Sequence, residues 1–248
     1  MPYALITGGT SGIGLAAARI FAQRGFDLIL VGRRKERLAS LEQELATEYT
    51  IKVKTFAVDV TEKDAVDKMF EDLSGFAIKV LVNNAGLALG KSPFQEAAWS
   101  DLEQMIDVNI KGFTQIALRS IPFLKATKGH MFQISSIAGI EAYEGGHVYC
   151  ATKSFVAQMT RALRIDLAGS GIRVTDIAPG AVETEFSQVR FKGDQAKATS
   201  VYEGYTPLSP DDIAQCMAAA YDLPHSVNVQ YMLVMPTDQA SATRICKS

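Results

Sequence analysis

The chain of 248 residues has the length of one α/β domain, and 48% of its residues are hydrophobic, which is enough for a large buried core. Its 25 Lys and Arg against 27 Asp and Glu leave a net charge of −2. That balance gives no electrostatic reason to expect nucleic acid or an anionic membrane as a partner. No apolar run approaches the ~20 residues that a membrane span needs.

Three cysteines, Cys150, Cys216 and Cys246, lie far apart in the sequence. They form neither a disulfide framework nor a metal-ligand cluster. The N-terminus runs directly into an apolar strand, without the basic and apolar regions of a signal peptide. We therefore expect no metal site and a cytoplasmic location.

Short apolar runs alternate with longer amphipathic stretches along the chain. The apolar runs predict strands at Tyr3–Thr7, Leu28–Val31, Lys52–Val58, Val80–Val82, His130–Ile134, Arg173–Ile177 and Val229–Val234. The stretches between them predict helices at Gly12–Arg24, Lys35–Tyr49, Asp64–Leu73, Trp99–Leu124, Val148–Leu167 and Pro210–Tyr221. Strands that are apolar on both faces and are followed by helices indicate a doubly wound parallel sheet. Without a repeat or a linker, we expect a single domain over residues 1–248.

A glycine-rich turn follows the first predicted strand and opens the first predicted helix. It reads Thr7-Gly-Gly-Thr-Ser-Gly-Ile-Gly14, with the spacing G-x-x-x-G-x-G at Gly8, Gly12 and Gly14. This spacing differs from the better-known G-x-G-x-x-G, but the physical requirement is the same. Glycines allow a tight turn and a close approach of the backbone to a pyrophosphate at a helix N-terminus. The turn, including Thr7, Thr10, Ser11 and Ile13, therefore predicts a dinucleotide site.

The end of the second predicted strand indicates which dinucleotide binds. NAD favours a carboxylate there, whereas NADP favours a cation for its 2′-phosphate. The chain reads Leu30-Val-Gly-Arg-Arg-Lys-Glu-Arg37, so Arg33 and Arg34 stand where a carboxylate would select NAD. Thr10 or Ser11 could add a hydroxyl to a phosphate site. We expect NADP(H), the alternative being a solvated basic start of a helix.

Tyr149 and Lys153 are four residues apart in a predicted helix and so share one face. An ammonium near a phenol favours the phenolate, and we expect it to lower the pKa of Tyr149 toward working pH. A phenol of that kind serves as a general acid or base. Ser136 lies upstream and could hydrogen-bond the same reacting oxygen.

The longest stretch without strand character runs from about residue 180 to residue 209. A connection of that length in one domain is usually functional, and beyond the carboxyl ends of parallel strands we expect it to form a substrate lid. Arg190 in this segment could hold a substrate carboxylate through both guanidinium nitrogens. An ion pair that closes the lid or joins subunits is an equal alternative for Arg190.

These motifs together resemble the short-chain dehydrogenase/reductase family over nearly the whole chain. The resemblance rests on the glycine-rich turn, Asp59-Val60, Asn83-Asn-Ala-Gly86, Asn109, Ser135-Ser136, Tyr149-x-x-x-Lys153 and Pro179-Gly180. It implies a Rossmann fold with a seven-stranded parallel sheet in the order 3-2-1-4-5-6-7.

The resemblance also implies roles for single residues. Asp59 and Val60 would contact the adenine, while Asn83, Ala85 and Gly86 would support the sheet and line the cofactor. The backbone of Asn109 would hold a water in a proton relay, and Ser136 would hydrogen-bond the substrate carbonyl. Tyr149 would act as the acid/base, and Lys153 would also hold the nicotinamide ribose. The segment that would grip the nicotinamide amide contains Pro179, Gly180, Val182 and Thr184.

A narrower resemblance points to the NADP-dependent 3-hydroxy acid dehydrogenases. It rests on Gly32–Leu38, Asn83–Gly90 and Thr184–Asp194, and it implies a substrate such as serine, allo-threonine, 3-hydroxypropionate or malonic semialdehyde. Glu144 departs from that branch, where Ala or Pro is expected, next to the catalytic tyrosine. A general carbonyl or 3-oxoacyl-thioester reductase is the alternative within the family.

Two other classes compete with a reductase. A non-enzymatic NADP sensor would not need Ser136, Tyr149 and Lys153 together, and an isomerase or dehydratase of the extended family generally carries a larger C-terminal domain. The predicted helices Trp99–Leu124 and Val148–Leu167 have more apolar positions than one sheet face needs, so we expect them to pair across subunits. By resemblance this gives a homotetramer, or a homodimer, with Pro236–Ser248 as a possible part of the contact.

Overall fold

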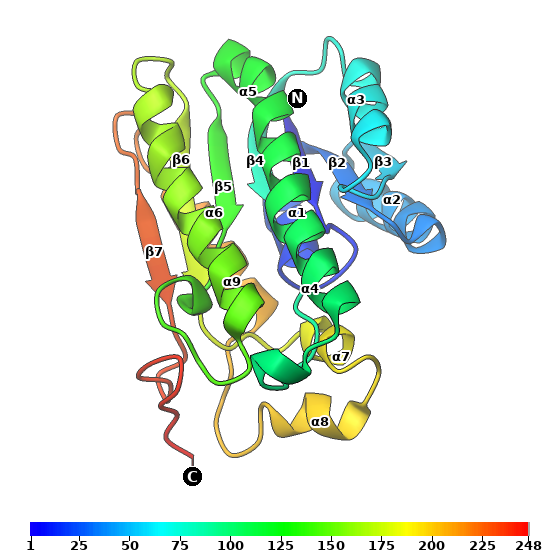
Figure 1. Cartoon of the computed structure of the whole chain (residues 1–248). Coiled ribbons are helices and arrows are strands. Elements are labelled where there is room, and N and C mark those ends of the chain that lie inside the picture. Colours follow the sequence, from blue (N-terminus) through cyan, green and yellow to red (C-terminus); the bar gives the residue numbers. More distant parts are fainter. Residues whose placement is uncertain (248) are drawn as a thin grey trace.

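Seven parallel strands form the centre of the computed structural model, which describes residues 1–247 (Figure 1). Their order is β3-β2-β1-β4-β5-β6-β7, which confirms the order implied by the family resemblance. The strands are β1 (Tyr3–Thr7), β2 (Asp27–Gly32), β3 (Val53–Ala57), β4 (Ile78–Asn83), β5 (His130–Ile134), β6 (Arg173–Pro179) and β7 (Tyr231–Val234). Every strand pair is parallel, so the carboxyl ends of all strands meet at one edge, at the bottom of Figure 1.

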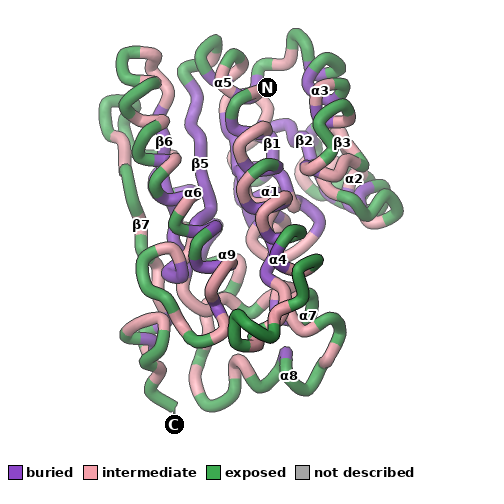
Figure 2. Tube along the Cα trace, viewed as in Figure 1, coloured by how far each residue is buried: buried purple, intermediate pink, exposed green. Residues whose placement is uncertain are grey.

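The central strands are buried on both faces because helices cover both sides of the sheet (Figure 2). Leu28 and Leu30 of β2 pack into one hydrophobic cluster, and Ile29 packs into the other. The first cluster includes residues of α1 (Gly12–Gln23), α2 (Lys35–Tyr49) and α9 (Pro210–Asp222). The second includes residues of α3 (Lys63–Asp72), α4 (Trp99–Ile106), α5 (Phe113–Thr127) and α6 (His147–Asp166). This arrangement is the doubly wound sheet that the apolar runs predicted.

The predicted helix Trp99–Leu124 is helical over its whole length, but it is not a single regular α-helix. A π-helical turn at Asp107–Gly112 separates α4 from α5. A Cβ added at Gly112 would lie 2.7 Å from a methyl group of Val60, so the helix and the segment that follows β3 approach closely at this point. Single π turns inside α-helices are often associated with functional sites, and this one contains Asn109.

Two short helices occupy the segment that we call the lid, residues 180–209. They are α7 (Phe186–Arg190) and α8 (Gln195–Ser200), and Figure 1 shows them beyond the carboxyl ends of the strands. The sequence did not predict them because each has fewer than two helical turns, too few for an apolar period to be recognised. The backbone of Val182 also bridges to Leu208, which brings the two ends of the lid together.

Within residues 1–247, no helix combines the length and the apolar character that crossing a bilayer requires. All three cysteines are free, with Cys150 buried and Cys246 exposed. No disulfide therefore contributes to the stability of the fold in the described residues, and burial of the apolar clusters has to supply it.

Candidate active site

A cavity of about 870 Å3 lies at the carboxyl edge of the sheet, beyond the neighbouring strands β1 and β4, whose following helices α1 and α4 pack on opposite faces. The order of the strands reverses at this point, and open α/β sheets bind their ligands in such crevices. The glycine-rich turn, the ends of the strands, the lid and the C-terminal tail all contribute residues to its wall.

The glycine-rich turn forms one end of the cavity. Gly8 and Gly12 have φ angles of +65° and +50°, which non-glycine residues rarely adopt, so the turn depends on glycine at both positions. Ser11 is the N-cap of α1 and makes no side-chain capping bond, so the first amides of the helix are left to a ligand. Thr10, Ser11, Gly12 and Ile13 line the cavity. This end of the cavity fits a pyrophosphate.

Three residues predicted to contact the cofactor lie behind the cavity wall instead. Thr7 Oγ1 accepts hydrogen bonds from the backbone N–H groups of Asn84 and Ala85, both at 3.0 Å. Asn83 is buried and donates to the carbonyl of Phe113 at 3.0 Å. A Cβ at Gly14 would overlap the carbonyl of Gly8, so this glycine permits close packing of the turn. Thr7, Gly14 and Asn83 therefore hold the wall in place, and Asn84, Ala85 and Gly86 form it.

The residues predicted to hold a 2′-phosphate form a cluster of polar side chains beside the turn. Arg34 Nη2 donates to Thr10 Oγ1 at 2.9 Å and to Ser11 Oγ at 3.0 Å. Arg33 is more exposed and lies 3.7 Å from the Asp59 carboxylate. A guanidinium and two hydroxyls directed at one point fit a phosphate group.

Two charged residues that the sequence analysis did not single out complete this cluster. Glu185, which directly precedes α7, accepts a hydrogen bond from Arg34 at 2.8 Å and another from Arg37 at 2.7 Å. Arg37 could have been found from its spacing, because it stands three residues after Arg34 on α2. Glu185 could not, since 151 residues separate it from Arg34.

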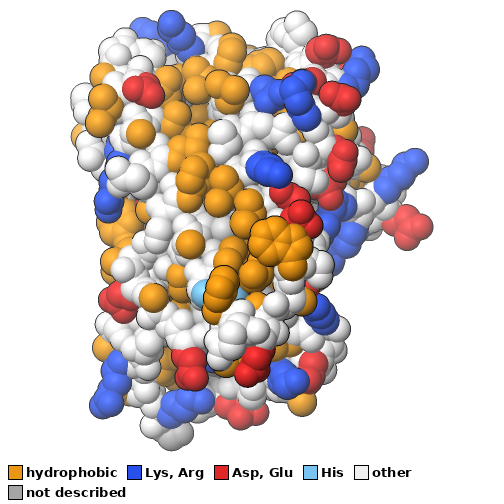
Figure 3. Space-filling view, viewed as in Figure 1, with side chains coloured by type: hydrophobic (Ala, Val, Ile, Leu, Met, Phe, Trp, Pro, Cys, Tyr) orange, Lys and Arg blue, Asp and Glu red, His pale blue; other side chains and the backbone are white. Residues whose placement is uncertain are grey.

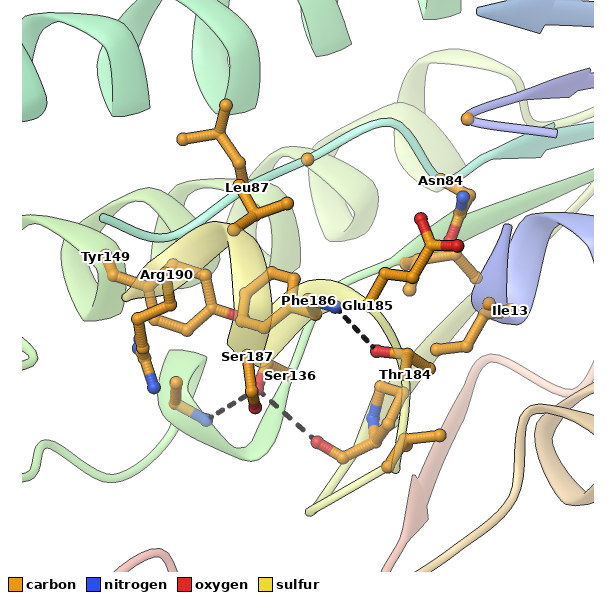
Figure 4. A pocket seen from close by; sticks show the side chains of 18 of the residues that line it. Ile13, Asn84, Leu87, Ser136, Tyr149, Thr184, Glu185, Phe186, Ser187 and Arg190 are labelled. Carbon is orange, nitrogen blue, oxygen red and sulfur yellow. Dashed lines mark hydrogen bonds between the residues drawn. The ribbon is translucent and has the colours of Figure 1, made fainter. Parts of the chain in front are cut away.

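The predicted catalytic residues come together at the other end of the cavity. Tyr149 and Lys153 lie on α6, and Ser136 precedes a short 3-10 turn after β5. The Ser136 side chain lies beside the Tyr149 phenol, where it opposes the rise in the pKa of the phenol that burial causes. Ser136 Oγ also accepts from the backbone N–H of Ala138 at 3.1 Å, which fixes its position (Figure 4). Lys153 Nζ donates to the carbonyl of Ile134 at 2.8 Å.

The expected effect of Lys153 on Tyr149 is not found in this structure. Burial raises the pKa of the Tyr149 phenol, and the nearby Tyr143 raises it further. The cation that counteracts burial is Arg190, while Lys153 Nζ is directed at Ile134 and lies 6.0 Å from the centre of the phenol ring. Burial also lowers the pKa of Lys153 to about 8. One helical turn places the two side chains on the same face, but desolvation outweighs their mutual effect.

A buried carboxylate behind Lys153 is a further residue that the sequence analysis missed. Asp176 on β6 is buried, and it raises the pKa of Lys153 against the larger effect of burial. Ser135 Oγ donates a hydrogen bond to Asp176. Apolar and polar residues that alternate along a strand show which side chains face the core. Because β6 is buried on both faces, its sequence does not show on which side Asp176 lies.

Asn109 lies in the π-helical turn, and its side chain is fully used within the fold. Oδ1 accepts from the backbone N–H of Leu87 at 2.9 Å, and Nδ2 donates to the carbonyl of Leu87 at 2.8 Å. Nδ2 also contacts Thr152 Oγ1 at 3.1 Å, which links the turn to α6. Only the backbone of Asn109 is therefore left for the predicted water relay, which stays a prediction.

The lid lies directly over Tyr149. The Phe186 ring is 5.7 Å from the phenol ring between centroids, and the Arg190 guanidinium carbon is 5.1 Å from the centre of the phenol ring (Figure 4). Arg190 also donates a hydrogen bond to the Tyr143 hydroxyl, while its buried Nε has no partner in the described residues. The Arg190 side chain thus brings a positive charge to the catalytic end of the cavity. Glu144 is exposed and does not line the cavity, unlike its neighbour Tyr143.

The predicted nicotinamide segment and the C-terminal tail close the remaining side. Six further residues that were predicted to contact the cofactor line the cavity. Asp59 and Val60 belong to the predicted adenine end, and the nicotinamide segment contributes Pro179, Gly180, Val182 and Thr184. Gln239 from the tail accepts a hydrogen bond from the backbone N–H of Ala181 at 2.8 Å. The tail was expected at a subunit contact, but Gln239, Ala242, Ile245 and Lys247 line the cavity.

A doubly wound sheet with a phosphate turn, a tyrosine–lysine–serine group and a lid over one cleft defines a nucleotide-dependent oxidoreductase of the Rossmann type. The family model described as short chain dehydrogenase matches residues 2–195. The chain belongs to this family, and the resemblance stated from its motifs is confirmed.

Individual relatives match over nearly their whole length. The chain is 47% identical to sulfoacetaldehyde reductase 2 of Chromohalobacter salexigens, over 95% of this chain and 94% of the relative. It is 44% identical to an NADP-dependent 3-hydroxy acid dehydrogenase of Salmonella typhi, over 96% of each. A solved structure described as the closed form of serine dehydrogenase complexed with NADP+ superposes with a TM-score of 0.91, at 41% identity and with 99% of both chains covered.

Proposed function

We propose that the protein is an NADP(H)-dependent oxidoreductase that interconverts a small 3-hydroxy acid and the corresponding carbonyl compound. Serine, allo-threonine and the pair 3-hydroxypropionate and malonic semialdehyde represent this substrate class. The observation that carries the proposal is the position of Tyr149, Ser136 and Lys153 in one cleft with the Arg34 cluster at its other end. Relatives named as acting on sulfoacetaldehyde and on 3-hydroxy acids support it, because both substrates carry an anionic group.

The cleft has the donors that the cofactor would need. Arg34, Thr10 and Ser11 would hold the 2′-phosphate, and the turn at Gly12 would hold the pyrophosphate. When bound, the cofactor supplies or accepts the hydride at its nicotinamide ring. Asp59 and Val60 would flank the adenine, and Pro179, Gly180, Val182 and Thr184 would line the nicotinamide end.

Tyr149 would act as the acid during reduction of a carbonyl. Its raised pKa keeps the phenol protonated at neutral pH, so that it can donate a proton to the carbonyl oxygen. The Ser136 hydroxyl would hydrogen-bond the same oxygen and stabilise the charge that develops there. In the oxidative direction the phenol has to lose its proton first, and the positive charge of Arg190 would favour that loss. The backbone of Asn109 would hold the water that returns the proton to the site.

Arg190 would hold the acidic group of the substrate. Its guanidinium lies over the ring of Tyr149, so an acid bound there places its carbonyl within reach of the phenol. Its buried and unpaired Nε offers a donor that no protein atom of the described residues uses. The hydrogen bond to Tyr143 limits the freedom of the side chain and would orient it toward the cavity.

The alternative within the family is a reductase of uncharged ketones or 3-oxoacyl thioesters. Such an enzyme would be expected to have an uncharged substrate pocket, but Lys91 and Arg190 both line the catalytic end of this cavity. The charge of these residues therefore favours an acid.

Two measurements test the proposal. Tyr149→Phe should abolish nearly all NADP+ reduction by 3-hydroxy acids and leave NADP(H) binding intact, since general acid–base catalysis is typically worth about 10²–10⁴-fold. Turnover at the wild-type rate would remove the mechanism. Arg190→Ala should raise KM for hydroxy acids strongly and change KM for an uncharged ketone little, and Arg190→Lys is the control that keeps the charge. Equal effects on both substrates would exclude a carboxylate clamp.

We also propose that the chain forms a homotetramer, or at least a homodimer, in the cytoplasm. Trp99 of α4, Leu118 of α5 and Ile165 of α6 are 68%, 61% and 77% exposed. Figure 3 shows apolar side chains gathered along these helices. An apolar surface of that kind favours contact with a second copy. Analytical ultracentrifugation that detects only monomer would contradict this proposal.

A further inference from the structure

Glu185 connects the lid to the basic side chains beside the phosphate turn. Its two carboxylate oxygens are divided between two arginines, with Oε2 at 2.8 Å from Arg34 Nη1 and Oε1 at 2.7 Å from Arg37 Nη1. The residue lines the cavity, so the ion pair stands at the cofactor site itself.

Arg34 is shared between this carboxylate and the phosphate turn. Its Nη1 donates to Glu185, while its Nη2 donates to Thr10 and Ser11. A 2′-phosphate that takes the hydroxyls of Thr10 and Ser11 would therefore lie against the guanidinium that Glu185 already holds. The two anions would be neighbours on one cation, and like charges at that separation repel each other.

Glu185 is ionised under ordinary conditions. Partial burial opposes ionisation, but the hydrogen bonds from Arg34 and Arg37 outweigh it and hold the pKa of the carboxyl below its usual value. Its negative charge is thus present whenever the cofactor arrives.

We propose that Glu185 occupies Arg34 as a substitute anion in the cofactor-free protein, and that the 2′-phosphate has to compete with it. Glu185 thereby weakens the binding of NADP(H) and leaves the binding of NAD(H) unaffected, because NAD(H) has no phosphate at this position. The inference rests on the proposed function, since it takes NADP(H) as the cofactor.

The position of Glu185 gives this competition a consequence for the catalytic end. Glu185 directly precedes α7, and the next residue, Phe186, packs on the ring of Tyr149. Release of the carboxylate from Arg34 would therefore leave the start of the helix that covers the catalytic tyrosine held by Arg37 alone. Binding of the phosphate at one end of the cleft and the position of the lid at the other are linked through the ion pairs of Glu185.

Glu185→Gln removes the charge and keeps the shape of the side chain. We expect the Kd of NADP+ for the cofactor-free variant, measured by isothermal titration calorimetry, to fall roughly three- to tenfold, since partly exposed ion pairs have modest energies. The Kd of NAD+ should change by less than about twofold. Glu183→Gln is the matched control, because Glu183 is exposed two residues earlier in the same lid and does not line the cavity. It should leave both constants unchanged.

A Kd of NADP+ that stays the same or rises in Glu185→Gln would overturn the inference, and a rise would mean that the carboxylate orients the arginines for the phosphate. When Arg34→Gln is already present, Glu185→Gln should no longer lower the Kd of NADP+, because competition requires the Arg34 guanidinium. An equal fall in the Kd of NADP+ when Arg34→Gln is present would mean that Glu185 acts only by long-range repulsion, and it would refute competition for Arg34. A wild-type protein that prefers NAD+ would instead refute the cofactor assignment.

Discussion

Replacing Lys153 by methionine should stabilise the cofactor-free protein at neutral pH, although it removes a residue of the proposed catalytic group. Burial lowers the pKa of Lys153 from its ordinary value of 10.5 to about 8. This difference corresponds to about 3 kcal/mol of unfavourable free energy when the charged amine is buried at pH 7. Methionine has a similar length and carries no charge, so its burial avoids that cost.

Part of the gain is lost with the hydrogen bond from Nζ to the carbonyl of Ile134, which is 2.8 Å long. A hydrogen bond of this kind contributes about 1 kcal/mol. We therefore expect Lys153→Met to raise the free energy of unfolding by about 2 kcal/mol at pH 7. For a chain of this size, that is a rise in Tm of about 4–8 °C.

The gain should reverse at high pH. Between pH 8 and pH 10.5 the folded protein binds fewer protons on this amine than the unfolded chain does, so the stability of the wild type rises with pH across this window. Above it, the amine is neutral in both states, and only the lost hydrogen bond distinguishes the variant. Lys153→Met should then be less stable than the wild type by about 1 kcal/mol.

Urea unfolding followed by circular dichroism at pH 7 and at a pH above 10.5, without cofactor, measures both differences. Lys125→Met is a suitable control, because Lys125 is exposed on α5 and its variant should show no such reversal. A Lys153→Met protein that is less stable than the wild type at pH 7 would refute the reasoning. A difference that is the same at both pH values would refute it as well.

Two further outcomes follow from buried charges. Asp176→Asn removes the carboxylate that raises the pKa of Lys153, so this pKa should fall below about 8, and the step in the pH profile of kcat/KM that titration of Lys153 causes should move to lower pH, with exposed Asp166→Asn as the control. An unchanged pH profile of kcat/KM would contradict a role for Asp176 in setting this charge. His130 is buried against Phe132, and burial lowers its pKa to about 2, so the folded state loses stability as pH falls below about 6.5. His130→Phe should reduce the loss between pH 7 and pH 5 by about 2 kcal/mol, and equal acid sensitivity in urea unfolding would exclude this assignment.

Local patterns in the sequence were sufficient for the architecture. Apolar runs of strand length between amphipathic stretches predicted the parallel sheet, because strands covered on both faces contain few polar residues. The π-helical turn at Asp107–Gly112 was not predicted, because apolar residues at helical spacing do not show which hydrogen bonds the backbone makes.

The chemistry of the site was predicted where its residues are close together in the sequence. Gly8, Gly12 and the N-terminus of α1 lie in one turn, and Tyr149 and Lys153 lie one helical turn apart, so spacing alone placed each group. The prediction that Lys153 lowers the pKa of Tyr149 was wrong, because burial of the phenol has the larger effect on this pKa. A sequence pattern does not show how much of the solvent around an ionisable group the fold removes.

The sequence by itself thus determined the fold, and it predicted the phosphate turn and the side chains proposed to react. Only the tertiary structure placed Glu185 on Arg34, Asp176 behind Lys153, and Arg190 over the ring of Tyr149. It also brought Gln239 of the tail to the wall of the cleft. These contacts join residues that lie up to 151 positions apart, and their charges act through space and through the exclusion of water.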